Sequence, residues 1–293
     1  MPIAVNSQRL VKLLKLDSSV LKLNIVETAE RVERFIKEYV ENSGTEGVVI
    51  GLSGGVDSNT IAALTGLAIG GDKVLGLMLP EEETRSEKDI EDAITVAKQF
   101  DLKTQICDIT PALRGIYKSI PIFDQSERLC KGNMKARIRM IYLYYYANKM
   151  NRIVCGSSDK SETMMGYFTK WGDVAADIYP IIDLYKTQVR RLAEHLGLSK
   201  QLSEKPATPA LWPKQLAETE LGIRYDVLDL ILCGIELFMD SEEIAKQLNI
   251  KEETVETIKT RWLYSEHKRR VLLGPKLGFR TFGADFRIPR DTY

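Results

Sequence analysis

The sequence predicts an α/β fold built on a doubly wound parallel sheet, with further helices at the N- and C-terminal ends. Three observations support this fold class. Short apolar runs alternate with segments of helical periodicity from about residue 25 to residue 196. A turn rich in glycine and serine joins the first apolar run to the helix after it. Beyond about residue 187 the strand-like runs stop and only helical patterns follow.

The elements can be justified in chain order. Strands are expected at 47–52, 74–79, 104–107 and 152–155, where short apolar or β-branched runs lie between polar segments. Helices with apolar residues every three or four positions are expected at 25–39, 57–69, 86–100 and 131–150, and later at 187–196, 225–238, 241–248 and 252–270. Strand–helix–strand repetition of this kind gives a parallel sheet with helices on both faces.

We expect one domain over residues 1–293, because no repeat or convincing linker divides the chain. Residues 1–45 would form an N-terminal helical arm, and 46–200 the α/β core. Residues 201–293 would form a loop followed by helices, with three prolines in the polar loop at its start.

Charge and composition exclude several classes of protein. Lys plus Arg and Asp plus Glu both number 41, whereas a protein that coats nucleic acid or a membrane normally has a basic excess. Four cysteines without a Cys-x-x-Cys pair, and two histidines, argue against a zinc or iron–sulfur site. No signal peptide or membrane-spanning run is present. We therefore expect a cytoplasmic protein with reduced thiols that binds neither nucleic acid nor membrane.

The turn after the first predicted strand has the sequence GLSGGVDS, residues 51–58. In an open parallel sheet, ligands bind outside the carboxyl ends of the strands. Gly54 and Gly55 lack a Cβ, so backbone N–H groups there can approach a ligand closely. The next helix adds unpaired N–H groups and partial positive charge, and Ser53 and Ser58 add hydroxyl donors. The turn therefore predicts a phosphate site, while its glycine spacing and the lack of a Gly-Lys pair exclude two common phosphate loops.

Two carboxylates suggest a divalent cation beside this phosphate site. Asp57 would repel phosphate directly, so it either acts as the acid of a helix N-terminus or holds Mg²⁺ that in turn holds phosphate. A polar turn at 156–162 follows the last predicted strand and should lie at the same edge of the sheet. Glu162 in that turn would complete the Mg²⁺ shell; the alternative is a solvated glutamate at the start of a helix.

Longer motifs resemble known families. The string Ser-Gly-Gly-x-Asp-Ser resembles the pyrophosphate loop of the ATP pyrophosphatase superfamily, whose members split ATP into AMP and pyrophosphate. The strings GSSDKSE, YFTKWGDVAADIYPIIDLYKTQV and SEHKRR resemble ammonia-dependent NAD synthetases, over about residues 25–275. These enzymes join ammonia to deamido-NAD at the expense of ATP. The resemblance implies the ATP-pyrophosphatase (adenine nucleotide alpha hydrolase-like) fold, ATP as co-substrate and Mg²⁺ as cofactor.

The resemblance also implies roles for individual residues. Those expected to bind ATP are Gly51, Leu52, Ser53, Gly54, Gly55, Val56, Asp57, Ser58, Ser157, Lys186 and Thr208. The metal would lie on Asp57 and Glu162. The residues expected to bind deamido-NAD are Arg137, Lys170, Asp177, His267 and Lys268. Cationic side chains suit a substrate that carries a pyrophosphate and a nicotinate carboxylate.

The implied reaction activates a carboxylate and then aminates it. The nicotinate carboxylate would attack the α-phosphate of ATP, and ammonia would then displace AMP from the mixed anhydride. No protein nucleophile is needed, so positioning and charge neutralisation should dominate catalysis, with Lys186 stabilising the leaving pyrophosphate. Asp173 is the candidate for orienting or deprotonating ammonia; the alternative is that it caps a turn. Since only about 45 residues precede the synthetase-like region, free ammonia is expected, with a separate glutaminase as the alternative.

Two other functions and two departures from the family pattern stay open at this point. Residues 241–262 resemble a helix-turn-helix, but the second helix carries Glu252 and Glu253 instead of basic residues, so packing is expected. Another ATP pyrophosphatase that amidates or thiolates a different substrate is the second alternative. Pro209 and the pair Leu216-Ala217 differ from the family pattern, which leaves loop closure over ATP in question.

Apolar faces of two predicted helices point to self-association. The helix at 25–39 and the tyrosine-rich residues 142–146 present more apolar surface than a lone subunit normally leaves in water. A homodimer, which the resemblance also implies, would cover them.

Overall fold

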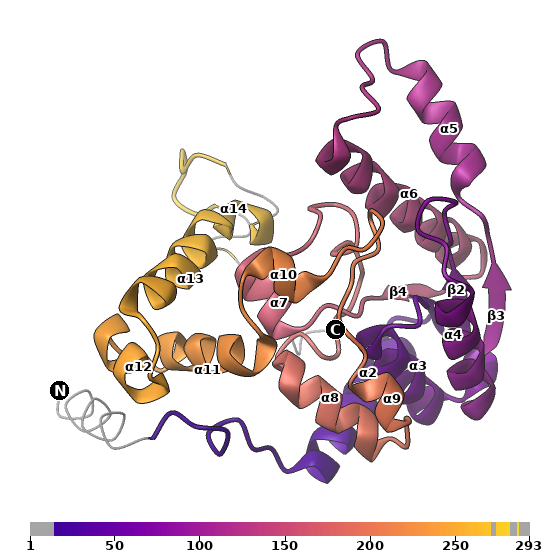
Figure 1. Cartoon of the computed structure of the whole chain (residues 1–293). Coiled ribbons are helices and arrows are strands. Elements are labelled where there is room, and N and C mark those ends of the chain that lie inside the picture. Colours follow the sequence, from indigo (N-terminus) through magenta and orange to yellow (C-terminus); the bar gives the residue numbers. More distant parts are fainter. Residues whose placement is uncertain (1–14, 271–273, 282–285, 287–293) are drawn as a thin grey trace.

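Four parallel strands lie at the centre of the protein, whose computed structural model describes residues 15–270, 274–281 and 286 (Figure 1). The strands are β1 (Val48–Gly51), β2 (Val74–Met78), β3 (Lys103–Ile106) and β4 (Ile153–Cys155). Their order in the sheet is β3-β2-β1-β4. The chain therefore first builds outward from β1 and then returns to its other side, so the switch point of the topology lies between β1 and β4. The predicted parallel sheet is confirmed, and every strand begins and ends within one residue of its predicted bounds.

Helices connect and flank the strands. Their bounds are α2 (Ile25–Asn42), α3 (Val56–Ile69), α4 (Glu87–Gln99), α5 (Thr110–Ser119), α6 (Arg128–Lys149), α7 (Lys160–Met165), α8 (Lys186–His195), α9 (Lys200–Ser203), α10 (Ala217–Leu221), α11 (Tyr225–Glu236), α12 (Ser241–Leu248), α13 (Glu252–Tyr264) and α14 (Glu266–Arg269), with a 3₁₀ turn at Gly71–Lys73.

The predicted set of helices needs two corrections. α5 and the short helices α7, α9 and α10 were not predicted, although Pro111 in the first turn of α5 is a start signal for a helix. The single helix predicted at 252–270 is divided at Ser265, whose hydroxyl donates to the carbonyl of Trp262. The short helix α14 follows, and its His267 and Lys268 line the cavity described below.

Alternation along β1 assigns its side chains to two layers. Val48 and Ile50 belong to the core that includes residues of α2, α3, α4 and α8, whereas Val49 packs with Leu143 and Ala147 of α6. α3 lies among α2, α4, α8 and the sheet, which explains why it is apolar around most of its circumference. α3 is thereby held rigidly, together with the turn that precedes it.

The helices after residue 216 form a second core around α11. Tyr225, Leu232, Ile244 and Val255 pack together there with residues of α7. Figure 1 shows α11, α12 and α13 as one group beside the sheet rather than on it. The first turn of α13 is acidic, with Glu252 and Glu253, and the helix buries Val255 and Ile258. The segment that resembles a helix-turn-helix is used for packing, as predicted.

Residues 1–14 of the predicted N-terminal arm lie outside the described residues. Among the helices that the structure describes, none has the length and apolar character needed to cross a bilayer.

Candidate functional site

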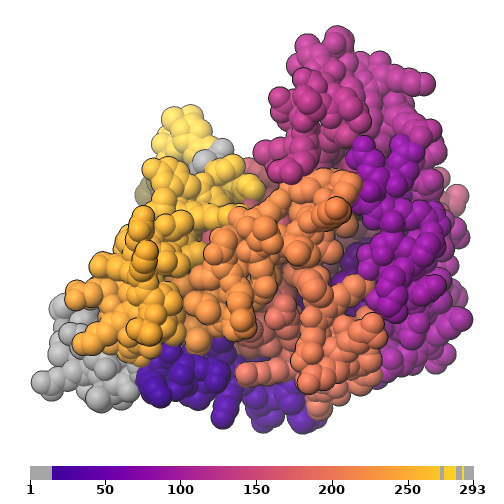
Figure 2. Space-filling model, viewed as in Figure 1, coloured from indigo at the N-terminus to yellow at the C-terminus, as the bar shows by residue number. Residues whose placement is uncertain are grey.

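A cavity of about 790 Å³ opens at the carboxyl ends of the strands around the switch point. Gly51 at the end of β1, Met78 at the end of β2 and Cys155 at the end of β4 line it. Further walls come from α6, from residues 166–173 and from the loop 205–217. Trp212 in this loop lies against Gly132 of α6, and Figure 2 shows orange surface next to magenta surface, so the loop lies across the cavity.

The turn at 51–58 is shaped for close backbone approach. Gly54 has φ +78°, and a Cβ there would lie 2.2 Å from the carbonyl oxygen of Asp89, so only glycine fits. The hydroxyls of Ser53 and Ser58 lie 3.0 Å apart, and the Ser53 N–H donates to Ser58 Oγ at 3.2 Å. The first turn of α3 begins directly after Gly55, and its N–H groups have no acceptor within the helix. This arrangement places a helix N-terminus and the Ser53 and Ser58 hydroxyls at the cavity, and the phosphate site stays a prediction.

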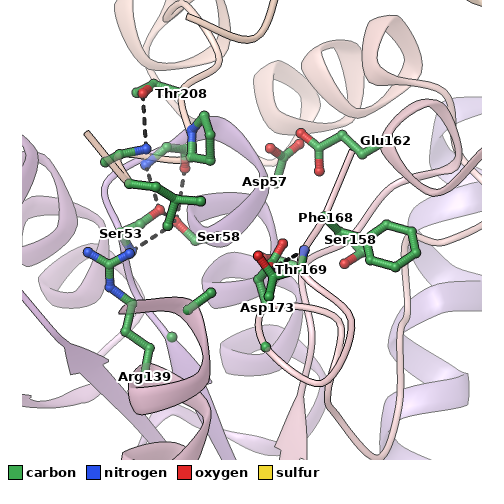
Figure 3. A pocket seen from close by; sticks show the side chains of 18 of the residues that line it. Ser53, Asp57, Ser58, Arg139, Ser158, Glu162, Phe168, Thr169, Asp173 and Thr208 are labelled. Carbon is green, nitrogen blue, oxygen red and sulfur yellow. Dashed lines mark hydrogen bonds between the residues drawn. The ribbon is translucent and has the colours of Figure 1, made fainter. Parts of the chain in front are cut away.

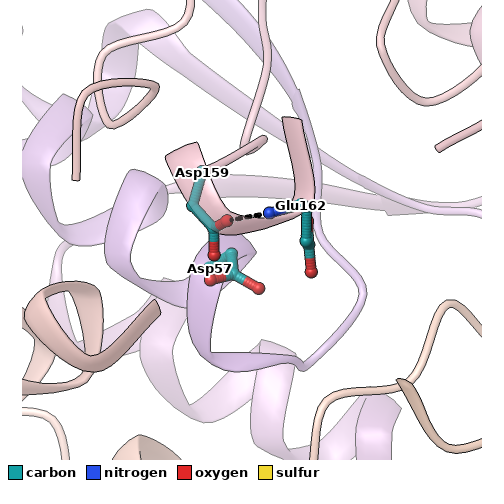
Figure 4. A group of neighbouring side chains, drawn as sticks. All are labelled: Asp57, Asp159 and Glu162. Atoms are coloured by element: carbon teal, nitrogen blue, oxygen red, sulfur yellow. Dashed lines mark hydrogen bonds between the residues drawn. The ribbon is translucent and has the colours of Figure 1, made fainter. Parts of the chain in front are cut away.

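Three carboxylates converge beside this turn (Figure 4). Asp57, Asp159 and Glu162 each bring one oxygen within 4.8 Å of the others. Asp159 is the N-cap of α7, and its Oδ1 accepts from the Glu162 N–H at 2.8 Å. This capping bond holds Glu162 against Asp57 across the ends of β1 and β4.

Lys186 neutralises the three carboxylates. Its Nζ lies 2.6 Å from Asp57 Oδ2, 2.8 Å from Asp159 Oδ2 and 2.8 Å from Glu162 Oε1, and its side chain is fully buried. Burial alone would lower the pKa of Lys186, but the three carboxylates outweigh it and raise that pKa well above its ordinary value. Burial raises the pKa of Asp159 and of Glu162, against the opposing charge of Lys186.

The donor set fits a divalent cation. Asp57 Oδ1 is buried and accepts no hydrogen bond, whereas Asp159 Oδ2 pairs with Lys186 Nζ. A buried carboxylate oxygen without a hydrogen-bond donor is suited to Mg²⁺, which takes a few protein carboxylates and completes its shell with water and phosphate. Figure 3 shows Asp57 and Glu162 turned toward one another at the wall of the cavity, near the turn that carries Ser53 and Ser58.

Most of the predicted site residues line the cavity. They are Gly51, Leu52, Ser53, Gly55, Val56, Asp57, Ser58, Arg137, Ser157, Glu162, Lys170, Asp173, Thr208, His267 and Lys268. Three other predicted residues do not line the cavity. Gly54 is buried within the turn, Lys186 is buried behind the carboxylates, and Asp177 forms hydrogen bonds away from the cavity. Asp177 accepts from the Val154 N–H at 2.7 Å and from the Tyr144 hydroxyl at 3.1 Å, which ties the segment after residue 170 to β4.

The predicted substrate-binding cations hold backbone carbonyls. Lys268 Nζ donates to the carbonyls of Gly166 and Phe168 at 2.8 and 2.9 Å. Lys170 Nζ donates to the His267 carbonyl at 2.7 Å, and Arg137 donates to the Lys170 carbonyl. These bonds fasten residues 166–170 to α14 and α6, so the cations organise this wall of the cavity.

Asp173 faces the cavity from the same segment (Figure 3). Its Oδ1 accepts from the Thr169 N–H at 2.8 Å, so Asp173 also caps the turn, which was the alternative role predicted for it. Burial raises the pKa of Asp173, and that hydrogen bond and the charges of Lys268 and Arg139 oppose the rise. A carboxylate with a raised pKa in a cavity is suited to handling a proton, which keeps Asp173 as the candidate for ammonia.

Sequence reasoning missed two residues of the site. Asp159 was not proposed for the carboxylate cluster, although the spacing Asp159-x-x-Glu162 is an N-cap signal that would place both residues in one helical turn. Arg139 lines the cavity as Arg137 does, and its Nε donates to the Leu79 carbonyl at 3.2 Å. Helical spacing alone did not distinguish these two arginines.

Comparison with known proteins decides the family. The model of the NAD synthase family matches residues 28–272. The chain belongs to the NAD synthase family. A relative from Hyperthermus butylicus, described as an NH(3)-dependent NAD(+) synthetase, is 42% identical over 259 residues, covering 88% of this chain and 93% of the relative.

Solved structures of NAD synthase relatives share the fold. The structure of an NMN synthetase from Francisella tularensis aligns with a TM-score of 0.77 at 33% identity, covering 87% of this chain and 100% of that chain. An NH3-dependent NAD synthetase from Campylobacter jejuni aligns with a TM-score of 0.72 at 29% identity, with the same coverage of 87% and 100%. These matches confirm the predicted NAD synthetase resemblance and the ATP-pyrophosphatase type of fold.

Proposed function

We propose that this protein amidates deamido-NAD with ammonia in the final step of NAD biosynthesis, with ATP converted to AMP and pyrophosphate. One observation carries the proposal: the glycine-lined turn and two carboxylates of the Asp57–Asp159–Glu162 cluster, Asp57 and Glu162, line one cavity at the switch point of the sheet. Membership of the NAD synthase family supports it. Amidation or thiolation of an unrelated substrate by an ATP pyrophosphatase is not favoured, nor is DNA binding, since the second helix of the helix-turn-helix-like segment is acidic.

The turn and its neighbours would bind ATP. The N–H groups at the start of α3 and the Ser53 and Ser58 hydroxyls would donate to the phosphates. Asp57 and Glu162, with Asp159 behind them, would hold Mg²⁺, which supplies charge neutralisation for the pyrophosphate when bound. Ser157 and Thr208 would contact the nucleotide from opposite walls. Lys186, whose ammonium group pairs with the three carboxylates, would contribute positive charge beside the phosphates.

The other half of the cavity would bind the acid. Arg137, Lys170, His267 and Lys268 line this half and remain the proposed contacts for deamido-NAD, with Lys170 and Lys268 also fixing the wall. Asp177 does not line the cavity, so its proposed role changes to holding the segment after residue 170 against β4. Asp173 would orient ammonia or take up its proton as the carbon–nitrogen bond forms. Since the carboxylate of the substrate is the nucleophile in the first step, no protein nucleophile is required, and the catalytic contribution lies in placing reactants next to each other.

The test is a reconstitution with defined substrates. The protein is incubated with ATP, Mg²⁺, ammonium and deamido-NAD, and NAD, AMP and pyrophosphate are measured together. Equal amounts of NAD and AMP are expected; formation of ADP would contradict the proposal. Nicotinate mononucleotide is run as a competing acid because one structural neighbour is an NMN synthetase, and glutamine replaces ammonium in a parallel reaction to test the nitrogen source.

We further propose that the active form is a cytoplasmic homodimer. On α6, Ile141 and Tyr145 lie one helical turn apart and are 53% and 62% exposed, and Val26 and Phe35 of α2 are also exposed. Apolar side chains of this size on neighbouring turns favour a protein partner. Light scattering should give twice the subunit mass of 33.2 kDa, and Tyr145→Glu should reduce it to one subunit. A monomeric wild type would contradict this proposal.

A further inference from the structure

The loop 205–217 is fastened to the phosphate turn by a lysine that has no role in the scheme above. Lys205 Nζ donates to the Gly54 carbonyl oxygen at 2.9 Å and to Asp92 Oδ2 at 2.7 Å, and it pairs with Asp89 Oδ1 at 2.5 Å. Its side chain is 19% exposed. One ammonium group therefore joins three separate segments: the loop, the turn at 51–58 and the first turns of α4.

The bond to Gly54 fixes the orientation of one peptide plane. The Gly54 carbonyl and the Gly55 N–H belong to the same planar trans peptide, so they point in opposite directions. Lys205 holds the carbonyl on its own side, and the Gly55 N–H lies on the side of Ser53 Oγ, its acceptor at 3.3 Å. Ser53 and Gly55 line the cavity at this point, whereas Gly54 does not.

Without a fixed partner this plane would be easily inverted. Neither Gly54 nor Gly55 has a Cβ to oppose rotation of the peptide between them. In the inverted orientation, the carbonyl oxygen would face the cavity, where it would repel the oxygens of a phosphate. The orientation of a single diglycine peptide thus decides whether the turn offers a donor or an acceptor to an anion.

We propose that Lys205 is a positioning residue for phosphate binding, which holds the Gly54–Gly55 peptide with its N–H toward the cavity. This inference rests on the proposed function, because the anion is the triphosphate of ATP or the pyrophosphate released from it. Lys205 lies at the base of the loop 205–217, so the turn is set for phosphate only when the loop is in place.

The rest of the loop is anchored independently of Lys205. Trp212 lies against Gly132 of α6, where a Cβ would come within 3.0 Å of the indole, and the Arg128 guanidinium stacks 4.7 Å from its ring centroid. The Ala217 N–H donates to the Ala207 carbonyl at 2.9 Å, which closes the loop on itself. The loop therefore has its own attachment to the cavity wall, and Lys205 connects the loop to the turn at 51–58.

Replacement of Lys205 should leave α4 folded. Lys88 Nζ lies 2.7 Å from Asp92 Oδ1, so a counter-charge for Asp92 persists when Lys205 is removed. The Ser86 hydroxyl still accepts from the Asp89 N–H and caps the helix. Lys205→Met is thus a suitable variant, and Lys205→Arg restores the charge and a donor. Lys200→Met is the matched control, since the Lys200 side chain is 77% exposed and pairs with the exposed Glu204.

The experiment measures binding of Mg²⁺–pyrophosphate and of ATP by calorimetry, followed by steady-state kinetics with both substrates varied. Lys205→Met should weaken both ligands about tenfold, the effect of losing one charge-assisted hydrogen bond. KM for ATP should rise with them while KM for deamido-NAD changes less than about twofold. Lys205→Arg should recover most of the affinity, and Lys200→Met should match the wild type.

The outcomes separate this inference from the proposed function. If wild-type protein binds neither ATP nor Mg²⁺–pyrophosphate, the proposed function fails. If it binds both and Lys205→Met binds them equally well, the positioning role is overturned. An equal rise in KM for ATP and for deamido-NAD, with a lower melting temperature, also overturns it, because that result describes general loosening of the fold. Should Lys205→Met not fold, Lys205→Gln is measured in its place under the same expectations.

Discussion

The two halves of the cavity use their charged side chains differently. Around Asp57 of α3, Lys186 of α8 neutralises that carboxylate and two more from the first turn of α7 at distances of 2.6–2.8 Å. In the half formed by residues 166–170 and α14, Lys170 and Lys268 instead donate to backbone carbonyls. The first half has its ionic partners assembled before any ligand binds, whereas the second uses its cations to fix the course of the chain. A basic residue in a binding motif therefore need not direct its charge at the ligand.

The largest expected effect comes from removing a carboxylate of the first half. Asp57→Asn and Glu162→Gln should each lower Mg²⁺-dependent turnover by about a thousandfold or more, since the proposed metal would lose a charged ligand. Circular dichroism should be unchanged. Glu91→Gln, on the exposed side of α4, is the control. Either variant retaining a tenth of wild-type turnover would remove that residue from the metal site.

Lys186→Met tests whether Lys186 provides the counter-charge of the three carboxylates in the first half. In EDTA the variant should be destabilised by about 3–5 kcal/mol, because three carboxylates would be left without their buried counter-charge. Mg²⁺ should restore more stability to the variant than to the wild type, since the cation would replace the missing ammonium group. Urea unfolding with EDTA and with MgCl₂ measures both effects. Equal stabilisation of the two proteins by Mg²⁺ would show that the metal lies elsewhere.

Lys268→Met tests the second half in the same way. Removal of its two bonds to carbonyls should loosen residues 166–168, so KM for deamido-NAD is expected to rise about tenfold. KM for ATP should stay within about twofold, because the ATP half does not depend on Lys268. Lys259→Met on the outer face of α13 serves as the control. A parallel rise in both KM values would mean that the halves are not independent.

The smallest effect is expected at the end of the loop 205–217, where α10 begins. Leu216 is the N-cap of α10 and provides no side-chain hydrogen bond to the helix. Leu216→Ser should add this bond and stabilise the protein by up to about 1 kcal/mol, with Leu216→Ala as the control for loss of the apolar side chain. Thermal unfolding measures the difference. No gain of Ser over Ala would show that α10 is held by its packing alone.

The sequence predicted the fold because its signals are local. β1, β2 and β4 are short apolar runs, and the turn at 51–58 lies between a strand and a helix that periodicity identifies separately. Asp57 and Glu162 were placed together by one topological rule, that parallel strands end at the same edge of the sheet. The resulting cluster in the structure has both of them as members.

What the sequence did not predict depends on distant contacts. Lys186 and Asp57 are 129 positions apart, and Lys205 and Gly54 are 151 apart, so no periodicity connects them. Whether Lys186 reaches a ligand or a carboxylate depends on how α8 packs against α3. One exception is local: the last predicted helix is divided at Ser265, whose hydroxyl donates to the Trp262 carbonyl, and helix propensity does not reveal this.

The geometry at Gly54 also determines how the chain tolerates change during evolution or directed mutagenesis. A library randomised at position 54 should yield glycine alone among functional clones, because any β-carbon would collide with the backbone of α4. Position 44 has a similar positive φ of +66° but open space around it, so asparagine and aspartate should be accepted there. Two glycines with similar φ angles thus differ completely in the freedom they leave to substitution.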